Sequence, residues 1–263
     1  MVTTDVASFV GEYPYRLISH GTPEWLLAQM DRLEIQRAWV GHLASFLYKD
    51  PAPGNTALQQ SIEPFSDRMA PIPVVNPGLP RWEDDANRAV EIGAPAVRAY
   101  PMHQGLDPCG GEMRVLTAAL ASAGLPLILT VRFEDLRQRH PQDHASDLPP
   151  SAVRTLVRSD PEVRLLVTHA DRSFIEEVHF GLTPTEANRV LWEISWVWGP
   201  PENDLAAMLE SMGIDRFTLG TGMPLRVPDT PFARLDLLDL PRSEESALLG
   251  ENLERWLSDL PRE

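Results

Sequence analysis

A histidine and an aspartate stand two residues apart, His169 and Asp171, directly after an apolar run that predicts a buried strand over Arg164–His169. Histidine titrates in the range that is useful for proton transfer, and a nearby carboxylate can orient its ring. We therefore expect His169 and Asp171 to act as an acid/base pair.

A second group of chemically active side chains follows the expected strand Leu125–Arg132. Asp135, Arg137 and His140 place a carboxylate, a guanidinium and an imidazole within two helical turns. Arg132 ends the strand, where it could hold an anionic substrate through a bidentate contact. We expect Arg132, Asp135 and Arg137 to bind substrate, and His140 is a further candidate acid/base group. The alternative is a salt bridge in an exposed loop, which would contribute little.

A third group is Arg98-Ala-Tyr100-Pro-Met-His103. Side chains alternate along a strand, so Arg98 and Tyr100 share one face and His103 lies in the loop beyond them. An inward-facing arginine is costly unless it is paired or binds an anion. We expect these three residues to contact substrate.

The elements that must position these groups alternate along the whole chain. The expected strands are Val2–Phe9, Arg37–Leu43, Ala70–Asn76, Ala96–Tyr100, Leu125–Arg132, Arg164–His169, Val190–Trp196 and Phe217–Thr221. The expected helices are Thr22–Leu33, Asn55–Ile62, Glu83–Ile92, Glu112–Ala123, Ser151–Arg158, one within Asp171–Asn188, Asn203–Met212 and Glu244–Leu257. This order predicts a single (β/α)8 barrel domain over residues 1–263, with strand-end residues meeting at its C-terminal face. A doubly wound sheet is the alternative, but no strand is followed by G-x-G-x-x-G.

Long Pro-rich loops at Asp50–Gly54, His140–Pro150 and Leu225–Pro231 would cover this face of the barrel. Trp196 is a candidate platform for stacking a substrate, and a core or lid role shared with Trp192 and Trp198 is the alternative. The remaining strand-end groups have plain structural interpretations: Asp5 would pair with an arginine inside the barrel, and His42 would be a core histidine.

The composition limits the classes of partner. The chain has 263 residues, 43% of them hydrophobic, and a formal net charge of −15. This charge argues against nucleic acids and anionic membranes as partners. The single cysteine, Cys109, and the lack of a signal or spanning segment predict a cytoplasmic location. We expect a small-molecule substrate and leave a homo-oligomer open.

The chain resembles the amidohydrolase-related family in a series of short segments in the same order. They are Thr4–Gly11, Val75-Asn76-Pro77, Val97–Pro101, Leu125–Ile128, Leu166–His169, Gly220–Pro224 and Gly250–Leu253. The resemblance implies a barrel of hydrolases and decarboxylases with a divalent metal at its mouth.

The same resemblance assigns the metal ligands to particular positions. The His-x-His of the first strand falls on Ala7 and Phe9, the histidine of the fifth strand on Thr130, and the aspartate of the last strand on Gly222. Among these positions, only the sixth-strand histidine, His169, is kept. A metal needs about three converging ligands, so we expect the usual site to be lost and no cofactor to be required. A zinc or other divalent site rebuilt from His20, His42 or His103 with Asp5 is the alternative.

Three functions remain open. The first is a hydrolase-like or decarboxylase-like enzyme that works without the usual metal on a small carboxylate or carbonyl compound, with Arg98 and Arg132 holding the anion and His169 moving protons. The second is a non-catalytic binding or regulatory barrel, which would have a closed or apolar mouth. The third is a divalent-metal hydrolase with a rearranged site.

Overall fold

The computed structural model of the chain describes residues 2–197 and 204–258. Its strands are β1 (Thr4–Val10), β2 (Arg37–His42), β3 (Met69–Pro71), β4 (Val97–Ala99), β5 (Leu127–Thr130), β6 (Leu165–Thr168), β7 (Val190–Glu193) and β8 (Phe217–Thr218). Its α-helices are α1 (Pro23–Arg32), α2 (Ala52–Ile62), α3 (Trp82–Glu91), α4 (Pro101–Gln104), α5 (Gly111–Ser122), α6 (Pro150–Ser159), α7 (Arg172–His179), α8 (Pro184–Ala187), α9 (Asp204–Met212), α10 (Thr230–Leu238), α11 (Arg242–Ser246) and α12 (Asn252–Ser258). Shorter helical turns are η1 (Leu43–Leu47), η2 (Glu63–Phe65), η3 (Ile214–Arg216) and the π-helical η4 (Ala247–Glu251).

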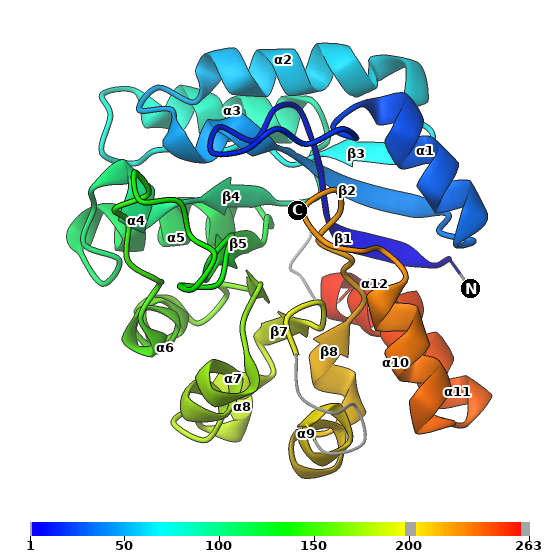
Figure 1. The fold of residues 1–263 in the computed structure, drawn as a ribbon. Helices are drawn as coiled ribbons and strands as arrows, with labels where there is room; N and C mark the ends of the chain where they lie inside the picture. Colours follow the sequence, from blue (N-terminus) through cyan, green and yellow to red (C-terminus); the bar gives the residue numbers. More distant parts are fainter. Residues whose placement is uncertain (1, 198–203, 259–263) are drawn as a thin grey trace.

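The strands form a parallel barrel that the helices surround (Figure 1). Hydrogen bonding gives two sheets, with the orders β1-β2-β3 and β4-β5-β6-β7-β8. A parallel bridge between Val74 and Arg98 joins the sheets on one side. On the other side, the Val6 N–H donates to the main-chain oxygen of Leu219 at 3.2 Å. The predicted (β/α)8 barrel is therefore confirmed, and the doubly wound alternative is not.

The alternation of side chains along each strand decides which of them fill the barrel. Val97 and Ala99 of β4 pack outward, in the core between strands and helices. Arg98 points the other way and is in register with Ile128, which is itself in register with Leu166 on β6. All three of these side chains are fully buried. A guanidinium thus sits beside aliphatic side chains in one layer of the barrel interior.

The expected loop Asp50–Gly54 is partly helical, because α2 begins at Ala52. The first N–H groups of a helix have no helical partner, so Pro53 in the first turn costs no hydrogen bond. A Cβ on Gly54 would lie 2.0 Å from the Ser45 Oγ, so a larger residue would displace this hydroxyl from its contact with His42 Nδ1. The prolines that suggested a loop instead begin a helix.

The C-terminal part also differs from the prediction. The expected loop Leu225–Pro231 ends early, because the unpredicted helix α10 begins at Thr230. The expected helix Glu244–Leu257 is divided into α11, η4 and α12, and the break falls at Gly250. A Cβ on Gly250 would lie 2.1 Å from the main-chain oxygen of Val2, so the chain passes too close for any other residue. Asn203, the expected start of another helix, lies outside the described residues.

Within the described residues, no helix combines the length and the apolar character needed to cross a membrane.

Candidate active site at the barrel mouth

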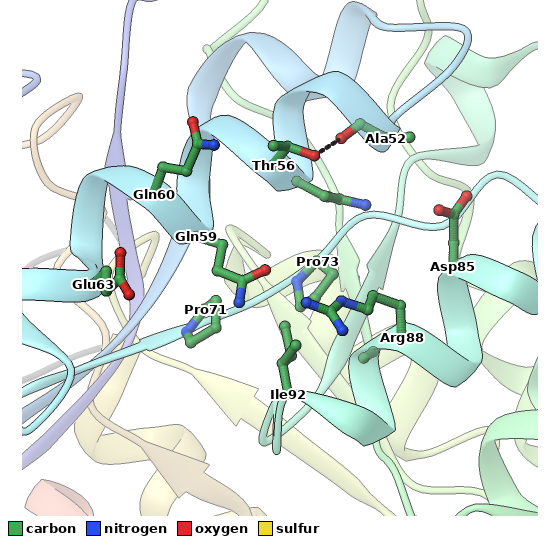
Figure 2. A pocket seen from close by; sticks show the side chains of 12 residues that line it. Ala52, Thr56, Gln59, Gln60, Glu63, Pro71, Pro73, Asp85, Arg88 and Ile92 are labelled. Carbon is green, nitrogen blue, oxygen red and sulfur yellow. Dashed lines mark hydrogen bonds between the residues drawn. The ribbon is translucent and has the colours of Figure 1, made fainter.

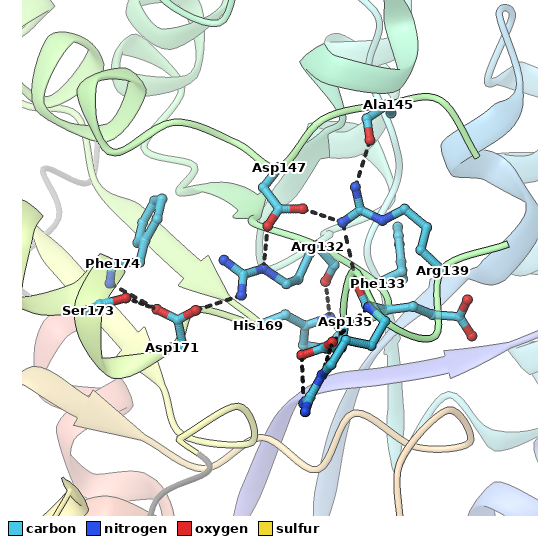
Figure 3. Close-up of polar contacts among 12 residues, drawn as sticks. Arg132, Phe133, Asp135, Arg139, Ala145, Asp147, His169, Asp171, Ser173 and Phe174 are labelled. Carbon is cyan, nitrogen blue, oxygen red and sulfur yellow. Dashed lines mark hydrogen bonds and ion pairs between the residues drawn. The ribbon is translucent and has the colours of Figure 1, made fainter. Parts of the chain in front are cut away.

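His169 is held in one orientation at the end of β6. It is fully buried and has a left-handed backbone with φ of 58°, which is uncommon for a residue other than glycine. Its N–H donates to Glu193 Oε2 at 3.1 Å. Its Nδ1 lies 2.9 Å from the main-chain oxygen of Arg132 (Figure 3). A carbonyl can only accept, so Nδ1 carries the hydrogen and Nε2 keeps a lone pair. That Nε2 has no hydrogen-bond partner within residues 2–197 and 204–258.

The imidazole of His169 is neutral at physiological pH. Burial, together with the positive charges of Arg226 and Arg98, lowers its pKa to about 3, although the bond to the Arg132 carbonyl acts in the opposite direction. In the free protein His169 is therefore available to accept a proton and holds none to donate from Nε2.

Arg98 carries a buried charge into the same space. Its side chain is fully buried, its Nη1 lies 3.4 Å from the Tyr100 hydroxyl, and its guanidinium lies 4.8 Å from the centre of the Phe9 ring. Its Nε and Nη2 find no hydrogen-bond partner in the described part of the chain. A buried cation in this state is unfavourable for folding, and an anionic ligand between these donors would compensate the charge.

Aromatic rings pack across the mouth above these two residues. The centre of the Phe133 ring lies 4.5 Å from that of Phe46, 5.5 Å from that of Tyr100 and 5.8 Å from that of Phe9. Tyr13 completes this group, whose five members are each at most 4% exposed and which we call the mouth aromatic cluster. The rings exclude water from Arg98 and offer flat apolar surfaces to a ligand.

The mouth is nearly closed in this conformation. A cavity bordered by Tyr100, Thr130, Arg132 and Phe133 has a volume of about 10 Å³, which is about the space of one water molecule. A larger hollow of about 520 Å³ lies outside the barrel between α2 and α3, lined by residues such as Gln59 (Figure 2). A ligand that reaches Arg98 through the mouth has to displace part of the mouth aromatic cluster.

Arg132 is already surrounded by carboxylates. Its Nη1 donates to Asp171 Oδ2 at 2.6 Å, and its Nε lies 2.8 Å from Asp147 Oδ2 (Figure 3). Arg139 pairs with the other oxygen of Asp147. An anionic substrate would have to displace one of these carboxylates, so the expected role of Arg132 in substrate binding remains a prediction.

Asp171 does not contact the ring nitrogen that it was expected to orient. Its Oδ1 accepts from the Phe174 N–H at 3.0 Å and from the Ser173 hydroxyl at 2.7 Å, so it caps the N-terminus of α7. The carbonyl of Arg132 orients His169 in its place.

Asp135, Arg137 and His140 lie on the loop after β5. Asp135 and Arg137 pair with each other at 2.8 Å, and the Arg137 side chain is 88% exposed. The ring of His140 stacks on Tyr15 with the ring centres 5.3 Å apart. Asp135 and Arg137 thus contact each other, while His140 packs against a different residue, and the catalytic or binding roles of all three remain predictions.

His103 and Trp196 border the mouth. The His103 Nε2 lies 3.2 Å from Asp143 Oδ1, and its ring packs edge-on against Phe46 with centres 4.7 Å apart. Trp196 is buried, with its ring centre 5.9 Å from that of His169. The role of Trp196 as a stacking platform remains a prediction, and Trp198 is outside the described residues.

Arg226 is a mouth residue that sequence reasoning missed. Its guanidinium lies 3.8 Å from the centre of the Trp196 ring, and burial lowers its pKa to about 10. It follows Gly222 by four residues, and its N–H donates to the Gly222 oxygen at 3.1 Å. A Cβ on Gly222 would lie 2.8 Å from the Cγ of Arg226 and 3.5 Å from the His169 Nε2. Because Gly222 has no side chain, it leaves this space open. The glycine was the one sequence signal that a nearby residue could fill it.

Glu193 was also missed. It is fully buried at the end of β7, where it accepts hydrogen bonds from the N–H of His169 and from the N–H and hydroxyl of Ser195. Burial raises the pKa of its carboxyl to about 7. A Cβ on Gly220 would lie 2.6 Å from Glu193 Oε1, so the glycine makes room for the carboxyl. Strand alternation places Glu193 inward and could have identified it.

Asp5 has hydroxyl and amide partners where we expected an arginine. Its Oδ2 accepts from the Ser8 hydroxyl at 2.5 Å and from the Thr221 hydroxyl at 2.6 Å. This expectation was wrong because β8 closes against β1 and brings Thr221 over the carboxyl.

The rearranged metal cluster does not form among the described side chains. His42 Nδ1 bonds to the Ser45 hydroxyl at 2.9 Å, and His20 stacks on Trp25. No three His, Cys, Asp or Glu side chains of the described residues come together as ligands would.

No protein-family profile matches the sequence, and no curated protein matches it. Solved structures do match its fold over nearly the whole chain. A dihydroxybenzoic acid decarboxylase from Polaromonas sp. JS666, with manganese and the inhibitor 2-nitroresorcinol bound, is 11% identical with a TM-score of 0.76, and the match covers 98% of this chain and 97% of that one. A probable 2-pyrone-4,6-dicarboxylic acid hydrolase from Acinetobacter baumannii, with citric acid bound, is 13% identical with a TM-score of 0.68, covering 98% and 100%. An uncharacterized TIM-barrel protein from Bordetella bronchiseptica is 13% identical with a TM-score of 0.72, covering all of both chains.

At these identities the likeness shows the fold, a TIM barrel, and it confirms that part of the resemblance seen in the sequence. The expectation that no cofactor is required is overturned, because manganese is bound in the Polaromonas decarboxylase and in further solved neighbours.

The side chains at the family's ligand positions do not themselves fit a metal. Ala7, Phe9 and Gly222 offer no side-chain donor, and the Thr130 hydroxyl is hydrogen-bonded to that of Thr168 at 3.0 Å. The guanidinium groups of Arg98, Arg132 and Arg226 act on His169, whereas manganese prefers oxygen ligands such as carboxylates. We therefore assign no metal ligands and derive no step through a metal.

Proposed function

We propose that this chain is an enzyme of the hydrolase or decarboxylase kind that acts on a small carboxylate at the barrel mouth. One observation carries the proposal: within the described residues, the Nε and Nη2 of Arg98 and the Nε2 of His169 are buried at the same end of the barrel without hydrogen-bond partners. Two structural neighbours are named as a decarboxylase and a probable hydrolase of carboxylic acids, which supports this class.

Arg98 binds the carboxylate in this proposal. Its Nε and Nη2 lie along one edge of the guanidinium and can donate two parallel hydrogen bonds to the two carboxylate oxygens. The buried surroundings make this contact stronger than it would be in water. The mouth aromatic cluster favours a flat ligand, so aromatic carboxylates are the substrates to test first.

His169 moves the proton. In hydrolysis its Nε2 takes a proton from the attacking water while the water oxygen bonds to the carbonyl carbon, and the departing group later receives that proton. In decarboxylation the carbon–carbon bond breaks, carbon dioxide leaves, the electron pair stays on the substrate carbon, and that carbon then takes up a proton. Because the free protein holds His169 neutral, the hydrolytic order, in which Nε2 first accepts a proton, fits it better.

The test is turnover of a panel of aromatic carboxylates and carboxylate-bearing lactones, assayed with and without added manganese. His169→Gln should abolish the turnover of any accepted substrate, and Arg98→Met should raise KM strongly. His20→Gln, at a histidine stacked on Trp25, is the matched control. Turnover that is unchanged in His169→Gln would contradict the proposed role.

A non-catalytic binding barrel is the second candidate, and the packed mouth favours it. The cavity of about 10 Å³ beside Phe133 leaves no room for a substrate without movement. If this candidate is right, carboxylates should bind saturably without any turnover.

We further propose that residues 1–263 form one domain and that the protein is cytoplasmic.

A further inference from the structure

A second cluster of positive charge lies at the end of the barrel opposite the mouth. Arg164, Arg189 and Arg216 directly precede β6, β7 and β8, so all three belong to the N-terminal ends of neighbouring strands. With Arg255 of α12 they line one cavity of about 370 Å³, which Trp256 also borders. This volume lies in the range of sites that hold small molecules.

The cavity contrasts with the charge of the chain. Four arginines line it and Asp215 is the one acidic residue among its described lining residues, whereas the whole chain has a formal net charge of −15. Clustered guanidinium groups in a concave site create a local positive potential and attract anions.

Two of the arginines have structural roles. Arg189 Nη1 donates to the main-chain oxygens of Val157 and Asp160, at 2.7 and 2.6 Å, and so satisfies carbonyl groups at the end of α6. The guanidinium of Arg164 lies 5.8 Å from the centre of the Trp256 ring. The hydrogen-bond partners of Arg189 are neutral, but the carboxylates of Glu186, Asp160 and Glu162 act on its charge from nearby, so the potential of the cavity rests mainly on the other arginines.

Arg216 and Arg255 make only long contacts in the described structure. The Arg216 Nη2 lies 3.4 Å from Asp215 Oδ2, and the Arg255 Nη1 lies 3.5 Å from Asn252 Oδ1. Both distances are beyond the usual range of charge-assisted hydrogen bonds. These two guanidinium groups therefore keep most of their capacity to bind a ligand.

We infer that this cavity binds a small, multiply charged oxyanion, either a phosphate or a polycarboxylate, between Arg216 and Arg255. Arg164 and Arg189 hold the cavity in shape, and Arg164 increases its positive potential. Oxygen atoms bearing a shared negative charge match the planar donor fork of arginine. The site is separate from the mouth and does not depend on the function proposed there.

The experiment is calorimetric titration of the full chain with inorganic phosphate and, separately, with citrate, at constant ionic strength set by sodium chloride. We expect saturable binding of at least one of them. The anion that binds more tightly shows whether the natural ligand is a phosphate or a polycarboxylate. Arg216→Gln/Arg255→Gln should weaken binding roughly tenfold or more. Arg114→Gln/Arg242→Gln removes two exposed arginines elsewhere and should bind as the unmodified chain does.

Further outcomes separate this site from the mouth. In the Arg98→Met background, which removes the proposed carboxylate site of the mouth, Arg216→Gln/Arg255→Gln should still weaken binding of the better ligand roughly tenfold. Equal binding with and without that pair of substitutions would overturn the inference. Absence of saturable binding, or an equal loss in the control pair, would overturn it as well. Circular dichroism checks folding, and Arg255→Gln alone, at an exposed position, replaces the double variant if the latter unfolds.

Discussion

The Nδ1 of His169 and the main-chain oxygen of Arg132 lie 2.9 Å apart, so the peptide that follows one strand fixes the tautomer of the histidine on the next. β5 and β6 are neighbours in the sheet, which brings the two strand ends together. The Nε2 lone pair is therefore set by backbone geometry and needs no carboxylate to orient it. Asp171, two residues beyond His169, instead begins α7.

Asp171→Asn should leave the tautomer of His169 unchanged. Asparagine also caps helices well, so the expected cost is about 1 kcal/mol or less, from the weakened ion pair with Arg132. Imidazole nitrogen NMR shifts report the tautomer, and Ser173→Ala, which removes one hydrogen bond to Asp171, is the control. A hydrogen that moves to Nε2 in Asp171→Asn would show that the carboxylate orients the ring after all.

His169→Gln should change how the free energy of unfolding depends on pH. The unfolded chain binds a proton at His169 below pH 6.5, whereas the folded chain binds one only near pH 3. Stability is therefore lost as pH falls through this window, by up to ~1.4 kcal/mol per pH unit for one proton. Without His169 the loss should be smaller. Urea unfolding between pH 3 and 6.5 measures it, and equal slopes in both proteins would contradict the buried neutral state.

Glu193→Gln should affect the pH dependence of stability in the opposite direction. The unfolded chain releases this proton above pH 4.5, while the folded chain keeps it until about pH 7. Stability from this group is thus lost as pH rises from 4.5 to 7. The variant should be less stable overall, because an amide cannot accept all the hydrogen bonds from His169 and Ser195. Its stability should nevertheless fall less over that range, and a slope identical to that of the unmodified chain would count against the raised pKa.

Arg98→Met should keep or increase stability. Replacing a buried charge by an apolar side chain of similar length is often neutral or stabilising by about 1–4 kcal/mol. Chemical denaturation of the ligand-free protein measures the change. Tyr100→Phe, which removes the hydroxyl 3.4 Å from Arg98, is the control and should have a small effect. A loss of several kcal/mol in Arg98→Met would mean that the guanidinium supports the barrel itself.

Local patterns were sufficient to predict the barrel, because strand and helix signals alternate and each buried strand is followed by a turn. They also placed Arg98 inward, since the alternation along β4 needs no knowledge of other strands. The expected contact between Asp171 and the His169 ring was wrong, because Asp171 caps the helix that begins beside Ser173 and Phe174. Its catalytic role remains a prediction. Sequence proximity to a histidine does not decide which atom a carboxylate contacts.

The remaining features depend on contacts between distant segments. Arg132 meets Asp147 only because the loop after β5 folds back over the mouth. The environment of Arg226 depends on a loop that leads into the unpredicted helix α10 and on the missing side chain of Gly222. The local sequence does not show why glycine occupies positions 250 and 54. The reason is visible only in the folded chain, where another segment passes close to each of them.

The measurement that tests the central claim most directly is calorimetric titration of benzoate into the unmodified chain and into Arg98→Met, with and without manganese. If Arg98 is the carboxylate site of the barrel mouth, the unmodified chain binds benzoate saturably and the variant binds it at least tenfold more weakly while remaining folded. Equal affinity in the two proteins, or no saturable binding by the unmodified chain in either condition, would contradict the account.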